Sequence, residues 1–198
     1  SFSAQDIDKL IMSFNPLDVM LKNYYPNEDD HSNLMAALLD PTKKHGLGTA
    51  GIYKLLDIVV GRKKSMESKC AAIRKAINAE GRVQVKTRQR GKLSVPDIEL
   101  FGQNFGIVIE NKRSFGLEHK TVSGWQTENE FTDSTDKKKE HILHVFIHPI
   151  GIAPKSRYFV LLDRQDIKDW YRRIAEQAKD QKLRAILNFY ADYYFRTI

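Results

Sequence analysis

SVPDIELFGQNFGIVIENKR, residues 94–113, predicts a β-hairpin that carries an unusual set of polar residues. Apolar and β-branched residues recur on both sides of GQNF (102–105), a pattern typical of two antiparallel strands joined by a short turn. Asp97, Glu110 and Lys112 interrupt this apolar pattern. Two acids and an amine are uncommon at half-buried positions of a hairpin. They are therefore candidates for a functional site at its open end.

The turn of the hairpin sets which residues face each other. If the loop has four residues, Phe101 pairs with Gly106, and Asp97 then lies opposite Glu110. Directly opposed residues have Cβ atoms roughly 5 Å apart. Two carboxylates at that distance repel when both are ionised, and a divalent cation such as Mg²⁺ or Mn²⁺ removes the conflict. Alternation puts Lys112 on the face of Glu110, where it can orient or deprotonate a water.

The chain is basic, and its basic residues are clustered. Its 198 residues carry a formal net charge of +7, with a pI near 9.4. The segment RVQVKTRQRGK (82–92) holds five basic residues and no acid, directly before the hairpin. A polyanion is therefore a plausible partner, and contact with a nucleic-acid backbone is expected here. The residues expected to make that contact are Arg82, Lys86, Arg88, Arg90 and Lys92.

Several classes of protein are excluded by composition. With 41% hydrophobic and 29% charged residues, the chain fits an ordinary globular protein. No apolar run is long enough to span a bilayer, and the N-terminus lacks the pattern of a secretory signal. The single cysteine, Cys70, cannot form an intrachain disulfide, which favours a reducing compartment. We expect a cytoplasmic protein with no membrane contact.

The spacing of apolar residues predicts the order of the remaining elements. Helices are expected within 1–27 and at about 29–40, 52–61, 66–81, 118–132 and 164–198. Strands are expected at about 83–87, 94–101, 106–113, 141–149 and 157–163. The sum is an α/β sandwich of helices, three strands, a helix, two strands and a helix.

Two short motifs in the hairpin resemble the signature of a known enzyme superfamily. Pro96-Asp97 and, after a twelve-residue gap, Glu110-Asn111-Lys112 resemble the motif of the PD-(D/E)XK nucleases. EDDHSNLMAALLDPTKKHGLG (28–48) is similar to the N-terminal segment of a branch that carries an acid, His-Ser, Asp-Pro and His-Gly. The resemblance runs from about Glu28 to Trp170, most of the chain.

The resemblance implies an α/β fold with a restriction-endonuclease-like αβββαβ core, whose mixed central sheet is flanked by helices. Extra N-terminal helices and a long C-terminal helix would complete it. We expect a single domain over residues 1–198. Its parts would be a helical N-terminal extension (1–27), the core (28–170) and the C-terminal helix (164–198).

The resemblance also implies a divalent-metal-dependent nuclease that hydrolyses phosphodiester bonds, in double-stranded DNA rather than RNA, and acts as an endonuclease. Asp97 and Glu110 would bind Mg²⁺ or Mn²⁺ through their carboxylates. The backbone carbonyl of Asn111 and the carboxylate of Glu28 would complete the shell. Lys112 would position the attacking water and support the transition state.

Two auxiliary residues and one departure belong to the same resemblance. Gln126 would pack under the site or touch the substrate backbone. By helical spacing, His31 lies one turn from Glu28 and could reach phosphate or metal, or it could cap the helix or pack against its surroundings. The strand before the hairpin often carries an acid in this branch. Lys86 and Arg88 lie there instead, which favours phosphate contact over metal binding by that strand.

Other interpretations stay open. Asp97 after a proline could cap a turn, and Glu110 with Lys112 could form a cross-strand ion pair. The chain could also be a nuclease-like module that binds nucleic acid without cutting it. An assembly protein that uses its aromatic C-terminal helix as a contact surface is a third class. The sequence does not decide whether the protein forms a homodimer.

Overall fold

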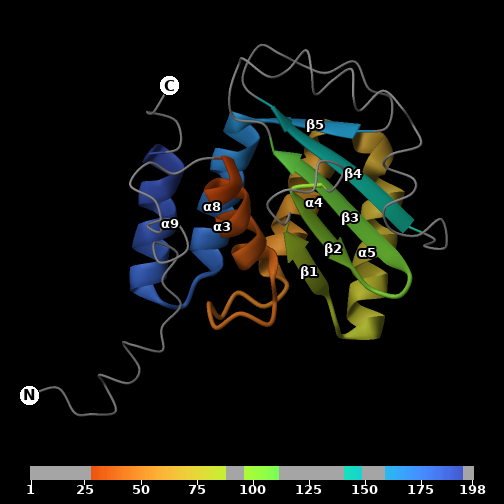
Figure 1. Cartoon of the computed structure of the whole chain (residues 1–198), viewed down its shortest axis with the longest axis horizontal. Coiled ribbons are helices and arrows are strands. Elements are labelled where there is room, and N and C mark those ends of the chain that lie inside the picture. Colours follow the sequence, from red (N-terminus) through yellow and green to blue (C-terminus); the bar gives the residue numbers. More distant parts are fainter. Residues whose placement is uncertain (1–27, 88–95, 112–140, 149–158, 194–198) are drawn as a thin grey trace, which may run out of the picture.

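The chain is described by a computed structural model, shown in Figure 1. The described residues are 28–87, 96–111, 141–148 and 159–193. The helices predicted within 1–27 and at 118–132 lie outside these residues.

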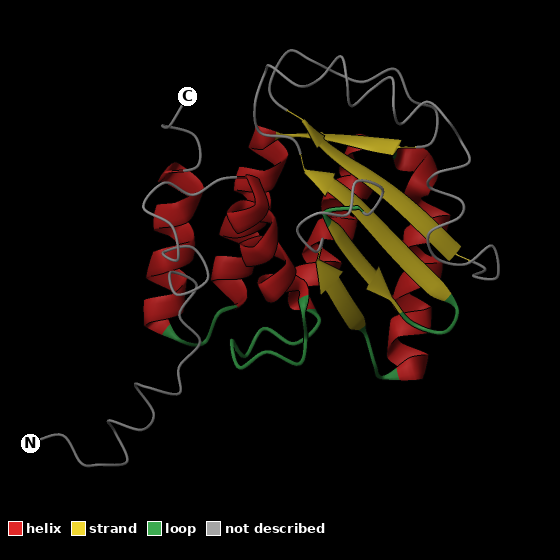
Figure 2. Ribbon diagram, in the orientation of Figure 1, coloured by secondary structure: helices red, strands yellow, loops and turns green. Residues whose placement is uncertain are grey.

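The described elements, coloured by type in Figure 2, follow the expected order along the chain. The helices are α3 (Glu28–Leu39), α4 (Ala50–Arg62), the 3₁₀ helix η1 (Lys64–Met66), α5 (Glu67–Glu80), α8 (Arg164–Gln177) and α9 (Gln181–Tyr193). The strands are β1 (Gln84–Thr87), β2 (Ile98–Phe101), β3 (Phe105–Asn111), β4 (His141–His148) and β5 (Phe159–Asp163). Across these described residues, every helix is too short or too polar to span a bilayer.

The five described strands form one mixed sheet in the order β1-β2-β3-β4-β5. β2 runs antiparallel to both β1 and β3, whereas β4 runs parallel to β3 and β5 parallel to β4. Phe101 pairs with Gly106, so the predicted register of the hairpin is confirmed. The turn is tighter than predicted, because the backbone N–H of Gly102 donates to the carbonyl of Phe105 at 3.1 Å.

The hairpin turn is held by the last residue of α5. The Glu80 carboxylate accepts hydrogen bonds from the backbone N–H groups of Gln103 at 2.6 Å and Asn104 at 2.9 Å. A Cβ at Gly102 would lie 2.1 Å from this carboxylate and 2.4 Å from the ring of Phe105. A side chain at position 102 would displace the Glu80 carboxylate or the Phe105 ring, and the two hydrogen bonds to Glu80 hold the turn against α5, which supports the register that runs from it.

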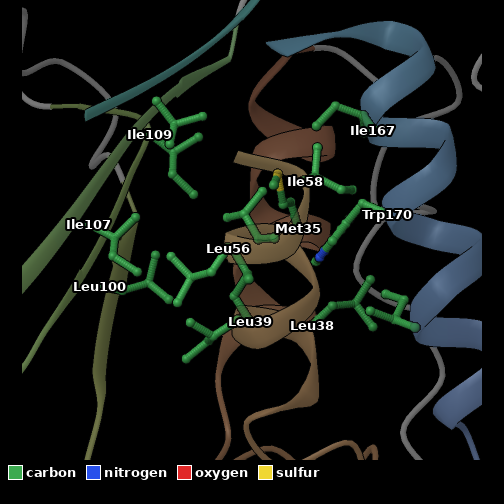
Figure 3. Close-up of a cluster of buried hydrophobic side chains, with 14 of the residues drawn as sticks. Met35, Leu38, Leu39, Leu56, Ile58, Leu100, Ile107, Ile109, Ile167 and Trp170 are labelled. Atoms are coloured by element: carbon green, nitrogen blue, oxygen red, sulfur yellow. The ribbon is translucent and has the colours of Figure 1, made fainter. Parts of the chain in front are cut away.

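The core lies between one face of the sheet and the helices (Figure 3). Leu100 of β2 points toward Leu56 of α4 and Leu39 of α3, and all three are buried. On the far side of α3 and α4, Trp170 of α8 is also buried and donates its indole N–H to the carbonyl of Gly51 at 2.8 Å. α3 and α4 therefore form a layer between the sheet and α8.

One predicted element is wrong: residues 164–198 do not form a single long helix. α8 ends at Gln177 and α9 starts at Gln181, although neither proline nor glycine lies between them. The carboxylate of Asp180 accepts from the backbone N–H of Lys182 at 2.7 Å and so caps the new helix. The rings of Tyr171 and Tyr190 lie 4.8 Å apart, and this packing of α9 against α8 (Figure 1) requires the break.

Candidate active site

Two acidic residues lie at neighbouring positions at the open end of the hairpin. The last pair in the β2–β3 ladder is Ile98 with Ile109, so the next position along the two strands is occupied by Asp97 and Glu110. Both side chains are buried, with exposed fractions of 2% for Asp97 and 1% for Glu110. The β2–β3 register from which the sequence predicts that the two acids lie close together is therefore observed. Their catalytic roles stay a prediction.

Asn111, the last residue of β3, connects this end of the sheet to α3. Its backbone N–H donates to Oδ2 of Asp97 at 2.8 Å, and its side-chain Nδ2 donates to Oγ of Ser32 at 3.1 Å. Within the described part of the chain, its Oδ1 atom is buried and has no hydrogen-bond partner. The side chain thus points to the helix layer, away from the face of Glu110, as alternation predicts.

The first turns of α3 lie beside this junction. Asp30, His31 and Ser32 are buried, with His31 2% exposed. Nδ1 of His31 hydrogen-bonds to the hydroxyl of Tyr190 in α9, and the two ring centroids are 5.7 Å apart. His31 therefore contacts the C-terminal helix, and its predicted role toward metal or phosphate stays untested. Glu28 begins α3, but its side chain lies outside the described part of the structure.

A further acid, which the sequence analysis missed, shares the sheet face of the site. Glu99 is 7% exposed and pairs with Lys86 of β1 across the ladder. The alternation of Asp97 and Glu99 along one strand could have revealed it, because residues two apart face the same side. Lys86 itself is exposed, and its ammonium lies 4.6 Å from the centre of the Phe101 ring.

Arg82 is exposed between α5 and β1. The other predicted site residues lie outside the described residues, so the structure does not test their positions. They are Arg88, Arg90, Lys92, Lys112 and Gln126.

The described residues supply part of a donor set that suits a hard divalent cation. Asp97 and Glu110 offer buried carboxylate oxygens at this end of the hairpin. Oxygen donors of this kind fit Mg²⁺ or Mn²⁺. Among the described side chains, no group of three or more histidines, cysteines or acids is arranged to hold a metal, so a complete shell needs donors from outside this set.

The His-Gly part of the N-terminal motif forms a structural turn between α3 and α4. His45 is buried, its Nδ1 accepts from the backbone N–H of Leu47 at 2.9 Å, and its Nε2 therefore donates to the carbonyl of Asp40 at 2.9 Å. Burial lowers the pKa of His45. The Asp40 carboxylate in turn accepts from the backbone N–H of Thr42 at 2.9 Å. These contacts hold α3 in place from its C-terminal end.

A mixed sheet with helices packed on it, and a hairpin that carries paired carboxyl groups at its open end, define a restriction-endonuclease-like α/β protein. A family model described as the PD-(D/E)XK nuclease superfamily matches residues 14–194. The chain therefore belongs to the PD-(D/E)XK nuclease superfamily. No curated protein and no solved structure matches the chain.

Membership confirms the resemblance and the fold class that the two sequence motifs predict. It points to a hydrolase of the nuclease type, with nucleic acid as its substrate. Nucleases of this superfamily generally use divalent metal ions.

Proposed function

We propose that the chain is a divalent-metal-dependent nuclease that hydrolyses phosphodiester bonds of double-stranded DNA and cuts within the strand. The observation that carries this proposal is the pair of carboxyl groups at adjacent ends of β2 and β3, Asp97 and Glu110. Both are at least nine-tenths buried, so little water is available to stabilise two negative charges. A bound cation would stabilise them, and superfamily membership supports this.

We assign the metal to Asp97, Glu110, the backbone carbonyl of Asn111 and the carboxylate of Glu28. The assignment of Glu28 is supported by the position of its helix. Ser32, four residues later and on the same helical face, accepts a hydrogen bond from Asn111 at 3.1 Å. The first turn of α3 therefore starts close to the end of β3.

The metal ion and Lys112 would have separate roles in hydrolysis. Mg²⁺ or Mn²⁺ would supply Lewis-acid polarisation of the phosphate and of water. Lys112, which follows Asn111 directly in the sequence, would orient the attacking water and stabilise the negative charge that develops on the phosphate. The water oxygen bonds to phosphorus and gives up a proton to solvent as the bond to the leaving oxygen breaks, and the leaving oxygen takes up a proton from solvent.

The basic edge of the sheet would hold the DNA backbone. Lys86 lies on the edge strand β1, and its cross-strand partner Glu99 shares the sheet face of Asp97. Arg82 is exposed just ahead of the same strand. The net charge of +7 adds a field that attracts a polyanion. Arg88, Arg90 and Lys92 would extend this contact, because they follow β1 in the sequence.

The direct test is cleavage of supercoiled plasmid, linear duplex, single-stranded DNA and RNA by the purified protein, with Mg²⁺, Mn²⁺ or chelator. We expect nicking of the plasmid with metal and none with chelator. Asp97→Asn, Glu110→Gln and Lys112→Ala should each lower the rate by about 100-fold or more. Glu176→Gln, an exposed acid of α8, is the matched control and should cut like the wild type.

Other outcomes would replace the proposal. Equal cutting by wild type and site variants would reveal a contaminating nuclease. Salt-sensitive DNA binding without cleavage in either metal would indicate a binding module. Self-association without affinity for polyanions would indicate an assembly protein. Size-exclusion chromatography with light scattering on the same samples decides whether a homodimer forms.

A further inference from the structure

Asn111, the residue after Glu110 at the end of β3, is fixed from two sides. Its backbone N–H is held by Asp97 at 2.8 Å, and its side chain is held by the Ser32 hydroxyl at 3.1 Å. All three residues are buried, with exposed fractions of 2–3%. A hydrogen bond shielded from water is costly to break, because the groups left behind find no solvent partner. The carbonyl of Asn111 therefore has little freedom.

We propose that Ser32 is a positioning residue of the nuclease site. Its hydroxyl holds Asn111, and through Asn111 it sets the position of the backbone carbonyl and of Asp97. This proposal rests on the proposed function, because it concerns the same two metal ligands. Ser32 acts through Asn111 and does not touch the metal.

The chemistry of Ser32 fits this role. A hydroxyl accepts the amide hydrogen of Asn111 and adds no charge beside Asp97 and Glu110, whereas an acid would raise the repulsion among them. The neighbouring residue strengthens the arrangement, because His31 bonds to Tyr190 and so ties the same helical turn to α9. The turn of α3 that carries Ser32 is thus held by β3, through Asn111, and by α9, through Tyr190.

The test compares Ser32→Ala, which removes the acceptor, with Ser32→Thr, which keeps the hydroxyl. Ser68→Ala, the loss of an exposed serine hydroxyl in α5, is the matched control. The first measurement is the Kd of Mn²⁺ by titration calorimetry without nucleic acid. The second is the unfolding temperature in chelator. The third is plasmid nicking against Mg²⁺ concentration, with kcat and KM for DNA determined at saturating metal.

We expect Ser32→Ala to raise the Kd of Mn²⁺ by about 10- to 100-fold, the usual effect of removing a group that orients a metal ligand. The Mg²⁺ concentration for half-maximal nicking should rise in parallel, and KM for DNA should stay unchanged. Ser32→Thr should restore the wild-type Kd, and Ser68→Ala should match the wild type throughout. A merely structural role would lower the unfolding temperature in chelator without this selective loss of metal affinity.

Three results would overturn the proposal. The first is that folded Ser32→Ala binds Mn²⁺ with the wild-type Kd. The second is that Ser32→Thr binds Mn²⁺ as weakly as Ser32→Ala does. If Ser32→Ala fails to fold, Asn111→Ala removes the same hydrogen bond from the other side, and a wild-type Kd there is the third. If the wild type itself neither binds Mn²⁺ nor cuts, the proposed function has failed. A wild type that does both, beside an unaffected Ser32→Ala, contradicts the role of Ser32 alone.

Discussion

Replacing Gly51 by alanine should force α3 and α4 apart. A Cβ at this position would lie 2.5 Å from the carbonyl oxygen of Leu38, about 0.9 Å inside the 3.4 Å at which ordinary contact begins. The obstacle is backbone, so no side-chain rotation can relieve it. The carbonyl of Gly51 also accepts the indole N–H of Trp170 at 2.8 Å, so a shift of α4 would disturb α8 as well.

The expected loss of stability combines two opposing effects. Overpacking of a close-packed interior costs about 1–3 kcal/mol. Alanine recovers up to about 1 kcal/mol relative to glycine in a helix. Because Gly51 is buried and a Cβ there would meet backbone, we place the overpacking at the upper end and the net loss at about 2 kcal/mol. For a chain of this size, each kcal/mol lowers Tm by about 2–4 °C, so the expected fall is about 4–8 °C.

The assay is urea and thermal denaturation followed by circular dichroism, with Gly61→Ala as the matched control. Gly61 lies in the same helix and is exposed, and a Cβ there would meet no atom within 4 Å. Gly61→Ala should therefore stabilise the protein, by up to about 1 kcal/mol. Equal stability of the two variants would refute the close approach of α4 to α3.

Three further predictions concern pH, capping and the contact between α3 and α9. Burial holds the pKa of His45 below its ordinary value of 6.5, so the unfolded chain binds a proton that the folded chain resists. The free energy of unfolding should fall as pH drops below about 6.5, and His45→Asn should flatten that slope in urea titrations at a series of pH values. Asp163→Ala should cost about 1 kcal/mol, because the Asp163 carboxylate accepts from the backbone N–H of Asp166 at 3.1 Å, whereas Asp163→Ser should recover most of it in the same assay. Tyr190→Phe removes the hydroxyl that contacts His31 and should lower the free energy of unfolding by about 1 kcal/mol. Thermal denaturation should then show a Tm lower by about 2–4 °C, and an unchanged Tm would contradict that contact.

The hairpin and most helix ends were predictable because their signals are local. Alternation of apolar residues defined β2 and β3, and the turn between them set the pairing of Phe101 with Gly106. Gly81, with φ of 62°, ends α5 where the sequence predicts a stop. Such patterns act over a few residues and need no knowledge of the rest of the chain.

The break between α8 and α9 was missed because no proline or glycine marks it. The available signal was Asp180, which caps α9 through its side chain. A capping aspartate inside a helical pattern is weak evidence by itself, since aspartates also occur on exposed helix faces. The helix breaks here because α9 packs against α8. The rings of Tyr171 and Tyr190, whose centroids lie 4.8 Å apart, are part of this packing.

The amino-acid sequence alone determined the order of the described elements, the register that brings two acids together, and the superfamily signature. The tertiary structure decided which helix supports those acids. Ser32 meets Asn111 across 79 positions of the chain, and His31 meets Tyr190 across 159. Contacts of such length depend on how the layers pack, and no periodic pattern within a segment encodes them.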